Sequence, residues 1–423
     1  MTRLLDNWLT SYVKYASVTE APKRMHFWAG VTAIAGALRR KIWIDMKRYQ
    51  VLCNFYTAFV APPGIVAKST TADISMNLLK QVPGVKFGPD IITWPALATA
   101  FAASSESFQL DGDWYPMSAM TLVASELGNL INPQDRDMVN LYINLWDGRK
   151  ALEKVTKMSG CDTIEAPWIN MIACTTPNWI TDNIPKAMIG GGLASRLLIV
   201  YADAKDKYVP FVDEVVSSDD ALLEKQLVHD LEHMSVNLAG PIHFTPEARD
   251  WERKRYRAFW EATISQSSSS TVDGYAARKQ THLFKTAMIL SVARNDSLVI
   301  ELQDLALAEA MLTDIEPDID RVFSGVGRSD DSLHTERFVE FIKRRGRVKY
   351  EEAYKQVHMY FPDPKVFEAI LAGVMKAGIL RLDHHPDGYY LVSGDRPRLQ
   401  VVPPPPAAAP PPKVGVDTEF KEG

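Results

Sequence analysis

Short apolar runs alternate with stretches of helical periodicity along most of the chain. Strand-length apolar runs occupy residues 55–60, 120–124, 168–174 and 197–201, and helical or polar stretches separate them. Strands that alternate with helices are typical of a largely parallel sheet. The pattern therefore predicts an α/β fold for the central part of the chain.

Helical periodicity dominates on both sides of these strands. Residues 1–45 predict helices, because Leu4, Trp8 and Tyr12 keep a helical spacing. Further helices are predicted at 219–237, 246–263, 275–294 and 302–323, and the serine-rich residues 265–273 are expected to form a flexible loop. No repeat is visible, which argues against a solenoid or a propeller.

The pattern changes again near Leu333. Helices are predicted at 333–345, 350–357 and 364–377, followed by short strands at 379–383 and 389–392 that a Pro-Asp-Gly turn joins. Three helices and a hairpin are the parts of a winged helix. The next segment, VVPPPPAAAPPPK, is expected to be an extended linker, and the chain ends in VGVDTEFKEG.

These changes predict four parts. They are an N-terminal helical segment (1–45), an α/β domain with a helical extension (46–330), a winged-helix domain (331–396) and a Pro-rich disordered tail (397–423).

Composition narrows the class of protein without identifying a partner. The 423 residues are 46% hydrophobic and 23% charged, which excludes a disordered chain, and the net charge of −5 excludes a uniformly cationic coat protein. The three cysteines show no CxxC spacing, so neither a disulfide framework nor a cysteine zinc site is supported. The longest apolar run, 27–38, is too short to span a membrane, and no signal peptide is visible. We expect a soluble cytoplasmic protein.

The strongest chemical signal is the segment AFVAPPGIVAKSTTADISMNLLK, a strand followed by a turn and a helix. Loop amides and a helix N-terminus attract phosphates, a lysine reaches the β and γ oxygens, and a hydroxyl coordinates Mg²⁺. Lys68 and Ser69 would take the last two roles. Ala61 and Ala67 replace usual glycines, and Ala67 needs a negative φ. The predicted nucleotide-binding residues are Pro63, Gly64, Ile65, Val66, Ala67, Lys68, Ser69 and Thr70. An ordinary strand-to-helix turn is the alternative.

Hydrolysis also requires an acidic residue near the attacking water. Glu126 ends the apolar strand MTLVASE and would orient and deprotonate that water. In ATPases of this class, an aspartate beside the glutamate helps to hold the metal. Ser125 stands at that position here, so Mg²⁺ would be coordinated by Ser69 and water. A surface glutamate at a strand end is the alternative interpretation.

Two further segments could complete such a site. ACTTP, residues 173–177, follows another strand and is suited to sensing a γ-phosphate. Arg196 follows a glycine-rich stretch and precedes the strand LLIVY, so it could reach a phosphate in a neighbouring subunit. A purely structural role for Arg196 is the alternative.

The order PPGIVAKST, TLVASELGNLI, MIACTTPNW and GGLASRLLIVY, after APKRMHFWAGVTAIAGALRRKIWI, resembles a family of phage and prophage RecA-like P-loop ATPases related to the DnaB-like replicative helicases. The resemblance covers about residues 20–300. It implies that Lys68 and Ser69 bind ATP phosphates and Mg²⁺, that Glu126 activates water, and that Arg196 is the arginine finger. Most members carry Asp-Glu where this chain has Ser125-Glu126. No primase motif is visible.

Other clusters offer competing chemistry. His229 and His233 match the H-x-x-E-H spacing of a zinc protease class, but the surrounding sequence predicts an amphipathic helix whose leucines, Leu222 among them, are buried and whose histidines lie near the polar face. Solvated histidines are therefore the preferred interpretation.

Local basic clusters offer contacts with DNA despite the acidic total. Five cations in seven residues lie at the end of the first winged-helix helix: Lys343, Arg344, Arg345, Arg347 and Lys349. The predicted recognition helix is poor in cations, so base-specific reading is not expected, and protein contact is the alternative role of the domain. Further surface patches are predicted at 39–41 with 47–48, and at Arg278, Lys279 and Lys285.

The first functional hypothesis is an ATP-driven motor on single-stranded or forked DNA, a replicative helicase that works as a homo-oligomeric ring in the cytoplasm of a bacterial host. The second is a non-motor winged-helix adaptor with a weakly hydrolysing nucleotide site, whose C-terminal peptide recruits a replication protein. A helicase-loading or packaging ATPase is the third.

Overall fold

The computed structural model describes residues 2–91, 93–148, 151–156, 160–185, 188, 192–265, 270–323, 326 and 330–394. Two compact units divide the chain: a main unit, Met1–Gly327, and a C-terminal unit, Arg328–Gly423. The N-terminal helices belong to the main unit and share its core.

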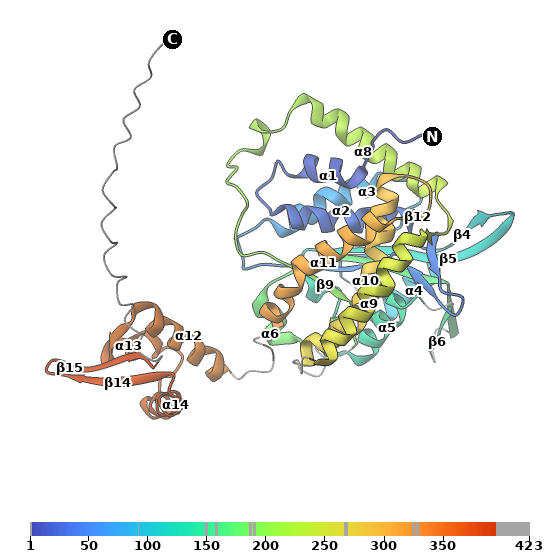
Figure 1. The fold of residues 1–423 in the computed structure, drawn as a ribbon. Helices are drawn as coiled ribbons and strands as arrows, with labels where there is room; N and C mark the ends of the chain where they lie inside the picture. The colour runs from blue at the N-terminus through green and yellow to red at the C-terminus, as the bar shows by residue number, and fades with distance from the viewer. Residues whose placement is uncertain are drawn as a thin grey trace, which may run out of the picture. The chain divides into compact units, whose positions relative to one another are not determined.

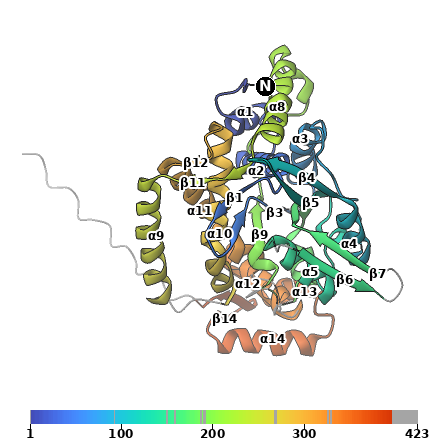
Figure 2. The same cartoon turned by 90° about the vertical axis from the view of Figure 1, so that its right-hand side faces the viewer.

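A five-stranded sheet forms the centre of the main unit, in the order β4-β5-β8-β3-β9 (Figure 2). The strands are β3 (Tyr56–Val60), β4 (Ser105–Leu110), β5 (Asp113–Ala124), β8 (Pro167–Thr175) and β9 (Leu197–Tyr201). Strands β5, β8, β3 and β9 are parallel, and β4 pairs with β5 in an antiparallel hairpin at the edge. The four predicted strands and the predicted largely parallel sheet are therefore confirmed.

Each central strand is buried on both faces because it separates two apolar cores. Phe59 of β3 packs in one core, and Tyr56, Ala58 and Val60 pack in the other. The same alternation holds along β8 and β9. Side chains of a strand point alternately to opposite faces, so a continuous apolar run is needed wherever helices cover both faces.

Helices cover the two faces of the sheet (Figures 1 and 2). α1 (Trp8–Ala16), α2 (Lys23–Leu38) and α3 (Lys68–Lys80) contribute to the first core, and α4 (Trp94–Ala103), α5 (Arg136–Trp146) and α6 (Pro177–Asn183) contribute to the second. α2 is buried almost all round because its alanines and glycines let neighbouring side chains approach. A Cβ on its Gly30 would lie 2.6 Å from Leu9 and Tyr12 side-chain atoms.

Four long helices complete the main unit: α8 (Ser218–Asn237), α9 (Pro246–Ser265), α10 (Ser270–Arg294) and α11 (Leu302–Phe323). The predicted loop at 265–273 is wrong for Ser265 and for residues 270–273, which are helical, and residues 266–269 lie outside the described part. Helix propagation is cooperative, so the buried turns of α10 extend it into the serine-rich segment. Leu222 is also not buried as predicted; it is 60% exposed.

Short strands and single helical turns fill the connections. The strands are β1 (Ile42–Asp45), β2 (Gln50–Leu52), β6 (Ala151–Thr156), β7 (Gly160–Glu165), β10 (Gly240–Pro241), β11 (His243–Phe244) and β12 (Val299–Ile300), and the 3₁₀ turns are η1 (Leu127–Asn129), η2 (Ala194–Arg196) and η3 (Val212–Glu214). The expectation of helix up to residue 45 is wrong for β1, which pairs with β2 and with the distant β10. Local periodicity does not reveal such long-range pairing.

The C-terminal unit contains α12 (Asp330–Arg345), α13 (Tyr350–Val357), α14 (Pro364–Lys376) and a sheet in the order β13-β15-β14. Its strands are β13 (Arg347–Lys349), β14 (Leu380–His385) and β15 (Gly388–Ser393). The three predicted helices and the predicted hairpin are confirmed, and β13 is an additional strand. The predicted proline-rich tail lies outside the described residues.

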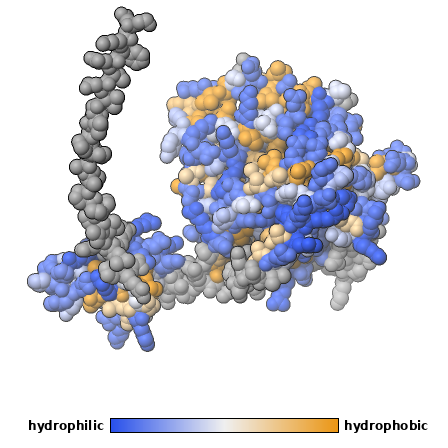
Figure 3. Space-filling model, in the orientation of Figure 1, coloured by the Kyte–Doolittle hydropathy of each residue, from blue (hydrophilic) through white to orange (hydrophobic). Residues whose placement is uncertain are grey.

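No helix in the described part of the chain combines the length and the apolar character needed to cross a bilayer. The face of the main unit that Figure 3 shows is mostly hydrophilic, with apolar residues in separate patches.

Candidate functional site

The carboxyl ends of the four parallel strands meet at one edge of the sheet. Val60 pairs with Thr175 on one side and with Tyr201 on the other, and Ala124 pairs with Ala173. The segments that follow these strands therefore lie next to one another. In open α/β sheets, ligands bind at this edge.

The loop from Ala61 to Ala67 leads from β3 into α3 at this edge. Gly64 has φ 73°, a left-handed conformation that favours glycine, and open space surrounds it. Ala67 has φ −79°. Its φ is negative, as the sequence analysis required, so the alanine fits without strain. Because Ala67 has no side-chain oxygen, it cannot cap α3. The positive end of the helix dipole therefore faces the loop uncapped.

Lys68 is the first residue of α3, and its side chain turns back over the loop. Its ammonium donates a hydrogen bond to the Ala61 carbonyl oxygen at 3.0 Å. Val66 is buried and anchors the loop, whereas Pro63, Gly64 and Ile65 are exposed. Ser69 and Thr70 are exposed on the first turn of α3. The loop thus presents its backbone, a lysine and two hydroxyls to solvent together.

Glu126 lies two residues beyond Ala124, the last residue of β5, and is exposed together with Ser125. Because β8 separates β5 from β3, Glu126 and the start of the loop are about 10 Å apart, two strand spacings. Thr175, at the end of β8, lies between the two strands across this gap.

Charged residues at this edge affect the pKa of the Cys174 thiol in β8. Burial raises the pKa of its thiol to about 12, Lys68 opposes the rise, and Asp73 and Glu126 add to it. Lys68 and Glu126 therefore both act on the end of the strand between them. The raised pKa keeps the thiol protonated and unreactive at neutral pH.

Two threonines complete the end of β8. The Thr175 carbonyl accepts a hydrogen bond from the Ala61 N–H at 3.3 Å, and its buried hydroxyl has no partner in the described part of the chain. The Thr176 hydroxyl caps α6 by accepting from the Trp179 N–H at 3.2 Å. The predicted ACTTP segment thus lies beside the loop, with Thr175 closest to it.

The oxygen donors at this edge suit Mg²⁺ better than a transition metal. No cluster of three His, Cys, Asp or Glu side chains that could hold a metal occurs among the described residues. Mg²⁺ is usually held by one or two protein oxygens together with phosphates and water. Ser69, Ser125 and Glu126 are exposed oxygen donors, so the residues present fit an ion that arrives with a nucleotide.

Arg196 lies at the opposite edge of the sheet, because it precedes β9 and its neighbour Leu197 pairs with Tyr56 at the start of β3. The length of β9 separates it from the Ala61–Ala67 loop by about 16 Å. Its guanidinium is 4% exposed, makes bidentate hydrogen bonds of 2.9 Å to Asp147, and lies over the Trp146 ring. Of the glycines before it, Gly192 has φ 66° and accepts from the guanidinium at 2.6 Å; Gly190 and Gly191 lie outside the described residues.

A buried polar cluster next to Arg196 was not found from sequence. The Lys285 ammonium is fully buried, donates to Asn54 Oδ1 at 2.5 Å and lies 3.6 Å from the centre of the Trp146 ring. Burial lowers its pKa well below the ordinary value. Lys279 is also buried and pairs with Glu316 at 2.8 Å. The predicted cationic surface patch is therefore wrong for Lys279 and Lys285, which their helix packs inside the unit, whereas Arg278 is partly exposed.

The predicted exposure of residues 39–41 is also wrong. All three side chains are buried. Arg39 donates to the Gly84 carbonyl and to Glu106, and Lys41 donates to the Ser235 carbonyl. Buried cations need such partners, so Arg39 and Lys41 join segments of the main unit.

The histidine pair on α8 is engaged in the protein's own contacts. His229 lies 3.0 Å from Asp230, and His233 lies 2.7 Å from Asp296 and 3.0 Å from the Asn237 amide. His233 is 4% exposed, so the expectation of a place near the polar face is wrong for it. The helix turns this residue toward the loop that contains Asp296.

The five basic residues of the C-terminal unit are exposed, and several have acidic neighbours. Arg345 pairs with Glu352 at 2.6 Å and Lys349 with Asp387 at 3.3 Å, and Arg344 lies 3.7 Å from Glu340. The Arg347 guanidinium lies over the Tyr390 ring. Lys343 is exposed at the end of α12. These carboxylates reduce the net positive charge of the surface.

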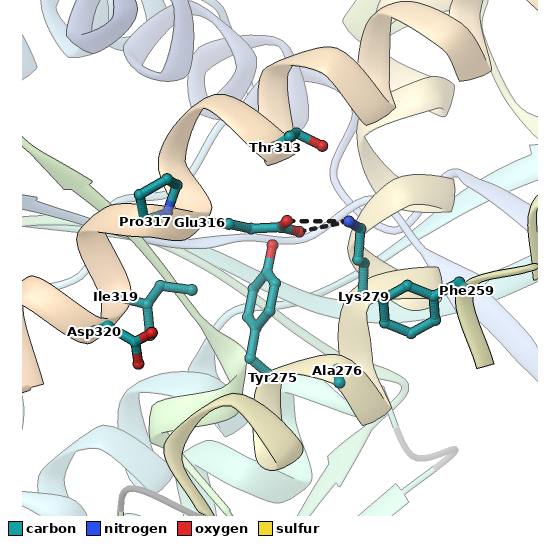
Figure 4. A pocket seen from close by; sticks show the side chains of 9 residues that line it. All are labelled: Phe259, Tyr275, Ala276, Lys279, Thr313, Glu316, Pro317, Ile319 and Asp320. Carbon is teal, nitrogen blue, oxygen red and sulfur yellow. Dashed lines mark hydrogen bonds and ion pairs between the residues drawn. The ribbon is translucent and has the colours of Figure 1, made fainter. Parts of the chain in front are cut away.

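A cavity of about 300 Å³ lies elsewhere, between α9, α10 and α11 (Figure 4). The Tyr275 hydroxyl and the Lys279 ammonium both point toward the Glu316 carboxylate, and apolar side chains such as Phe259 and Ile319 form the walls. The loops at the carboxyl ends of the strands do not line it. The loop from Ala61 to Ala67 therefore lies outside this cavity.

Comparison of the chain with models of protein families found no match, and comparison with curated proteins found none either.

Proposed function

We propose that this chain is an ATP-hydrolysing DNA motor with a RecA-like core, acting as a phage-type replicative helicase. One observation carries the proposal: an uncapped helix N-terminus behind a glycine turn, with Lys68 and Glu126 on either side of the end of β8. Phosphates bind at such helix ends, and a base across the gap can reach an attacking water.

The proposed reaction is transfer of a phosphoryl group to water. Mg²⁺ supplies Lewis-acid charge neutralisation when it is bound with ATP. The loop N–H groups and the Lys68 ammonium would hold the phosphates, and the Ser69 hydroxyl would be a ligand of the metal. Glu126 accepts a proton from water. Phosphate would replace the Ala61 carbonyl as partner of Lys68, because a charge-assisted contact is stronger than one to a neutral oxygen.

The C-terminal unit fits the proposal as a winged helix that contacts DNA phosphates through its exposed cations. The arrangement of α12, α13 and α14 with a three-stranded antiparallel sheet supports this proposal. We propose that the tail after it recruits a replication partner and that the chain assembles as a ring. In such a ring, Arg196 could reach the ATP of a neighbouring subunit only if contact between subunits broke its ion pair with Asp147.

A second candidate function is a nucleotide-binding adaptor that hydrolyses ATP slowly. Two observations favour it: Ser125 provides no carboxylate for the metal, and Arg196 is held inside its own chain. A helicase-loading or packaging ATPase would use the same site with another partner.

The test compares ATP hydrolysis by wild type, Lys68→Ala and Glu126→Gln, each with and without single-stranded DNA. Lys68→Ala should lose nucleotide affinity, whereas Glu126→Gln should keep it and lose at least about 100-fold in turnover. Lys80→Ala, at the other end of α3, is the control and should behave as wild type.

DNA should raise the wild-type rate if the chain is a motor. Hydrolysis that is slow, insensitive to DNA and still dependent on Lys68 would favour the adaptor. If Lys68→Ala hydrolyses ATP at the wild-type rate, the loop is not the ATP site, and both the motor and the adaptor are wrong.

A further inference from the structure

A cleft of about 340 Å³ opens at the edge of the sheet opposite the phosphate loop. Residues of the β1–β2 hairpin line one side, and residues of the β4–β5 hairpin line the other. The β4–β5 hairpin projects from the main unit (Figure 1). We name this space the aromatic cleft; its lining residues are Arg40, Trp43, Gln50, Phe108, Tyr115, Pro116 and Ala166.

Three aromatic rings from the two hairpins meet in this cleft. Phe108 and Tyr115 are directly opposite each other on β4 and β5, and their rings stack at 5.6 Å. Trp43 of β1 lies 6.2 Å from Tyr115, centre to centre. Tyr49, in the β1–β2 turn, is 62% exposed, and Trp114, which precedes Tyr115 on β5 and points to the other face of that strand, is 69% exposed. Large aromatic side chains usually bury most of their surface, so this concentration indicates a binding surface.

Arg40 gives the cleft a buried positive charge. Its guanidinium donates to the Pro167 carbonyl at 2.7 Å and to the Gly148 carbonyl at 3.1 Å. No carboxylate pairs with it in the part of the chain that the structure describes. Burial lowers the pKa of Arg40 to about 10. A buried cation without a counter-charge favours an anionic ligand.

The charges around the rim are mixed. Lys47 and Arg48 are exposed in the β1–β2 turn, and Lys47 lies 3.5 Å from Asp45. Asp111 and Asp113 flank the tip of the β4–β5 hairpin. These aspartates would repel a ligand with a dense negative charge. A ligand in which negative groups alternate with flat apolar rings suits both the cations and the aromatic walls.

We propose that the aromatic cleft holds an unpaired nucleotide of a single-stranded nucleic acid, with its base against Tyr115 and Trp43 and its phosphate toward Arg40. The exposed ring of Tyr49, in the β1–β2 turn, would contact a neighbouring base. Base stacking on aromatic side chains tolerates every sequence, as a protein that moves along a strand requires. The inference rests on the proposed function in that it identifies where the DNA is held.

The cleft and the ATP site can be tested separately because they lie at opposite edges of the sheet. Tyr115 lies in the exposed first third of β5, whereas Glu126 follows its far end. Substitutions in the cleft should therefore change DNA affinity in the absence of ATP and leave DNA-independent hydrolysis unchanged.

The experiment measures fluorescence anisotropy of a labelled oligothymidylate with the full chain, without ATP. Tyr115→Ala should weaken binding roughly 5- to 100-fold, the range for loss of one base stack. Tyr115→Phe keeps the ring and should bind within about twofold of wild type. Tyr208→Ala removes another exposed aromatic residue of the main unit, 87% exposed and outside the cleft, and should have no effect.

Photo-crosslinking of an oligonucleotide that contains 4-thiothymidine provides a second readout. The crosslinked peptides should include Trp43 or residues 108–116. Equal affinity of wild type and Tyr115→Ala, with crosslinks only elsewhere, would overturn the proposal. Displacement of the oligonucleotide by stoichiometric thymidine monophosphate would show that the cleft takes free nucleotides and would overturn the assignment to a strand.

These outcomes are distinguishable from failure of the proposed function. If Lys68→Ala leaves hydrolysis unchanged but Tyr115→Ala still weakens oligonucleotide binding, the motor is wrong and the cleft assignment stands. If Lys68→Ala loses hydrolysis but Tyr115→Ala binds the oligonucleotide as wild type does, the ATP site stands and the cleft assignment is wrong.

Discussion

At the scale of single residues, two buried histidines make the stability of the main unit depend on pH. His282 donates to the Ser195 carbonyl at 3.0 Å, and burial lowers its pKa to about 3. His26 lies 3.0 Å from the Thr19 hydroxyl, and burial lowers its pKa to about 4. Both values lie below 6.5, the ordinary value for histidine. The native state therefore holds both rings neutral at neutral pH.

Stability should fall as the pH falls from 6.5 toward 4. In this range the unfolded chain binds protons that the native state does not, so acid favours unfolding. Each histidine should cost about 1–2 kcal/mol between pH 7 and pH 5. His282→Gln keeps an N–H donor for Ser195 without titrating, so urea unfolding at the two pH values should show a smaller difference for this variant.

Exposed His243 is the matched control. His243→Gln should leave the pH dependence as it is in wild type. An unchanged pH dependence in His282→Gln would show that the ring is not held neutral.

At the scale of elements, glycines have opposite roles in helices of the two units. A Cβ on Gly36 of α2 would lie 2.4 Å from Leu79 of α3 and 3.2 Å from the Thr121 hydroxyl, whereas a Cβ on Gly373 of α14 would meet nothing within 4 Å. Gly36 therefore allows two helices and the sheet to approach, and Gly373 only loosens its own helix.

Alanine should destabilise the first position and stabilise the second. Gly36→Ala overpacks a buried contact and should cost about 1–3 kcal/mol in the main unit. Gly373→Ala should add about 0.5–1 kcal/mol to the C-terminal unit, because alanine loses less backbone entropy in a helix. Thermal unfolding of the full chain checks both, and a neutral Gly36→Ala would show that α2 can move away from α3.

At the scale of the whole molecule, the two units predict two contributions to DNA binding. The aromatic cleft would act mainly through stacking, whereas the cations of the C-terminal unit would act through phosphates and be sensitive to salt. Ion pairs such as Arg345 with Glu352 limit how many phosphates the C-terminal unit can neutralise.

Removal of the C-terminal unit after residue 327 should therefore reduce the salt dependence of oligonucleotide affinity. The slope of log affinity against log salt should become smaller by about 2 to 4 for a single strand. The full chain with Lys343→Ala, Arg344→Ala and Arg347→Ala should reproduce most of this change. A slope that stays at the wild-type value in both proteins would assign the C-terminal unit to protein contacts.

Much of the fold follows from local pattern, as particular elements show. The apolar run before the Pro-Pro-Gly turn and the helical spacing after Lys68 predict β3 and α3 at nearly their observed bounds. Apolar periodicity is a local property, and it suffices where a segment has one dominant environment. Strands of two to four residues, such as β10 and β1, have no such signal because distant partners stabilise them.

Part of the candidate site could likewise be predicted from the sequence, and part could not. Residue types and spacing predicted Lys68, Ser69 and Glu126 near a phosphate, and the strand order brings their segments to one edge. The burial of Arg196 and Lys285 could not be predicted, because a cation looks the same in a sequence whether it faces water or a buried carboxylate.

The sequence by itself determined the alternation of strands and helices, the turn at Gly64 and the chemistry that follows it, because these depend on neighbours a few residues away. Only the tertiary structure decided which charges remain exposed. Arg39, Arg196 and Lys285 are buried because segments far apart in the chain supply their partners, whereas Lys47 and Lys343 are exposed. Burial is a property of the whole packed chain, and the cleft formed by two hairpins 60 residues apart depends on it as well.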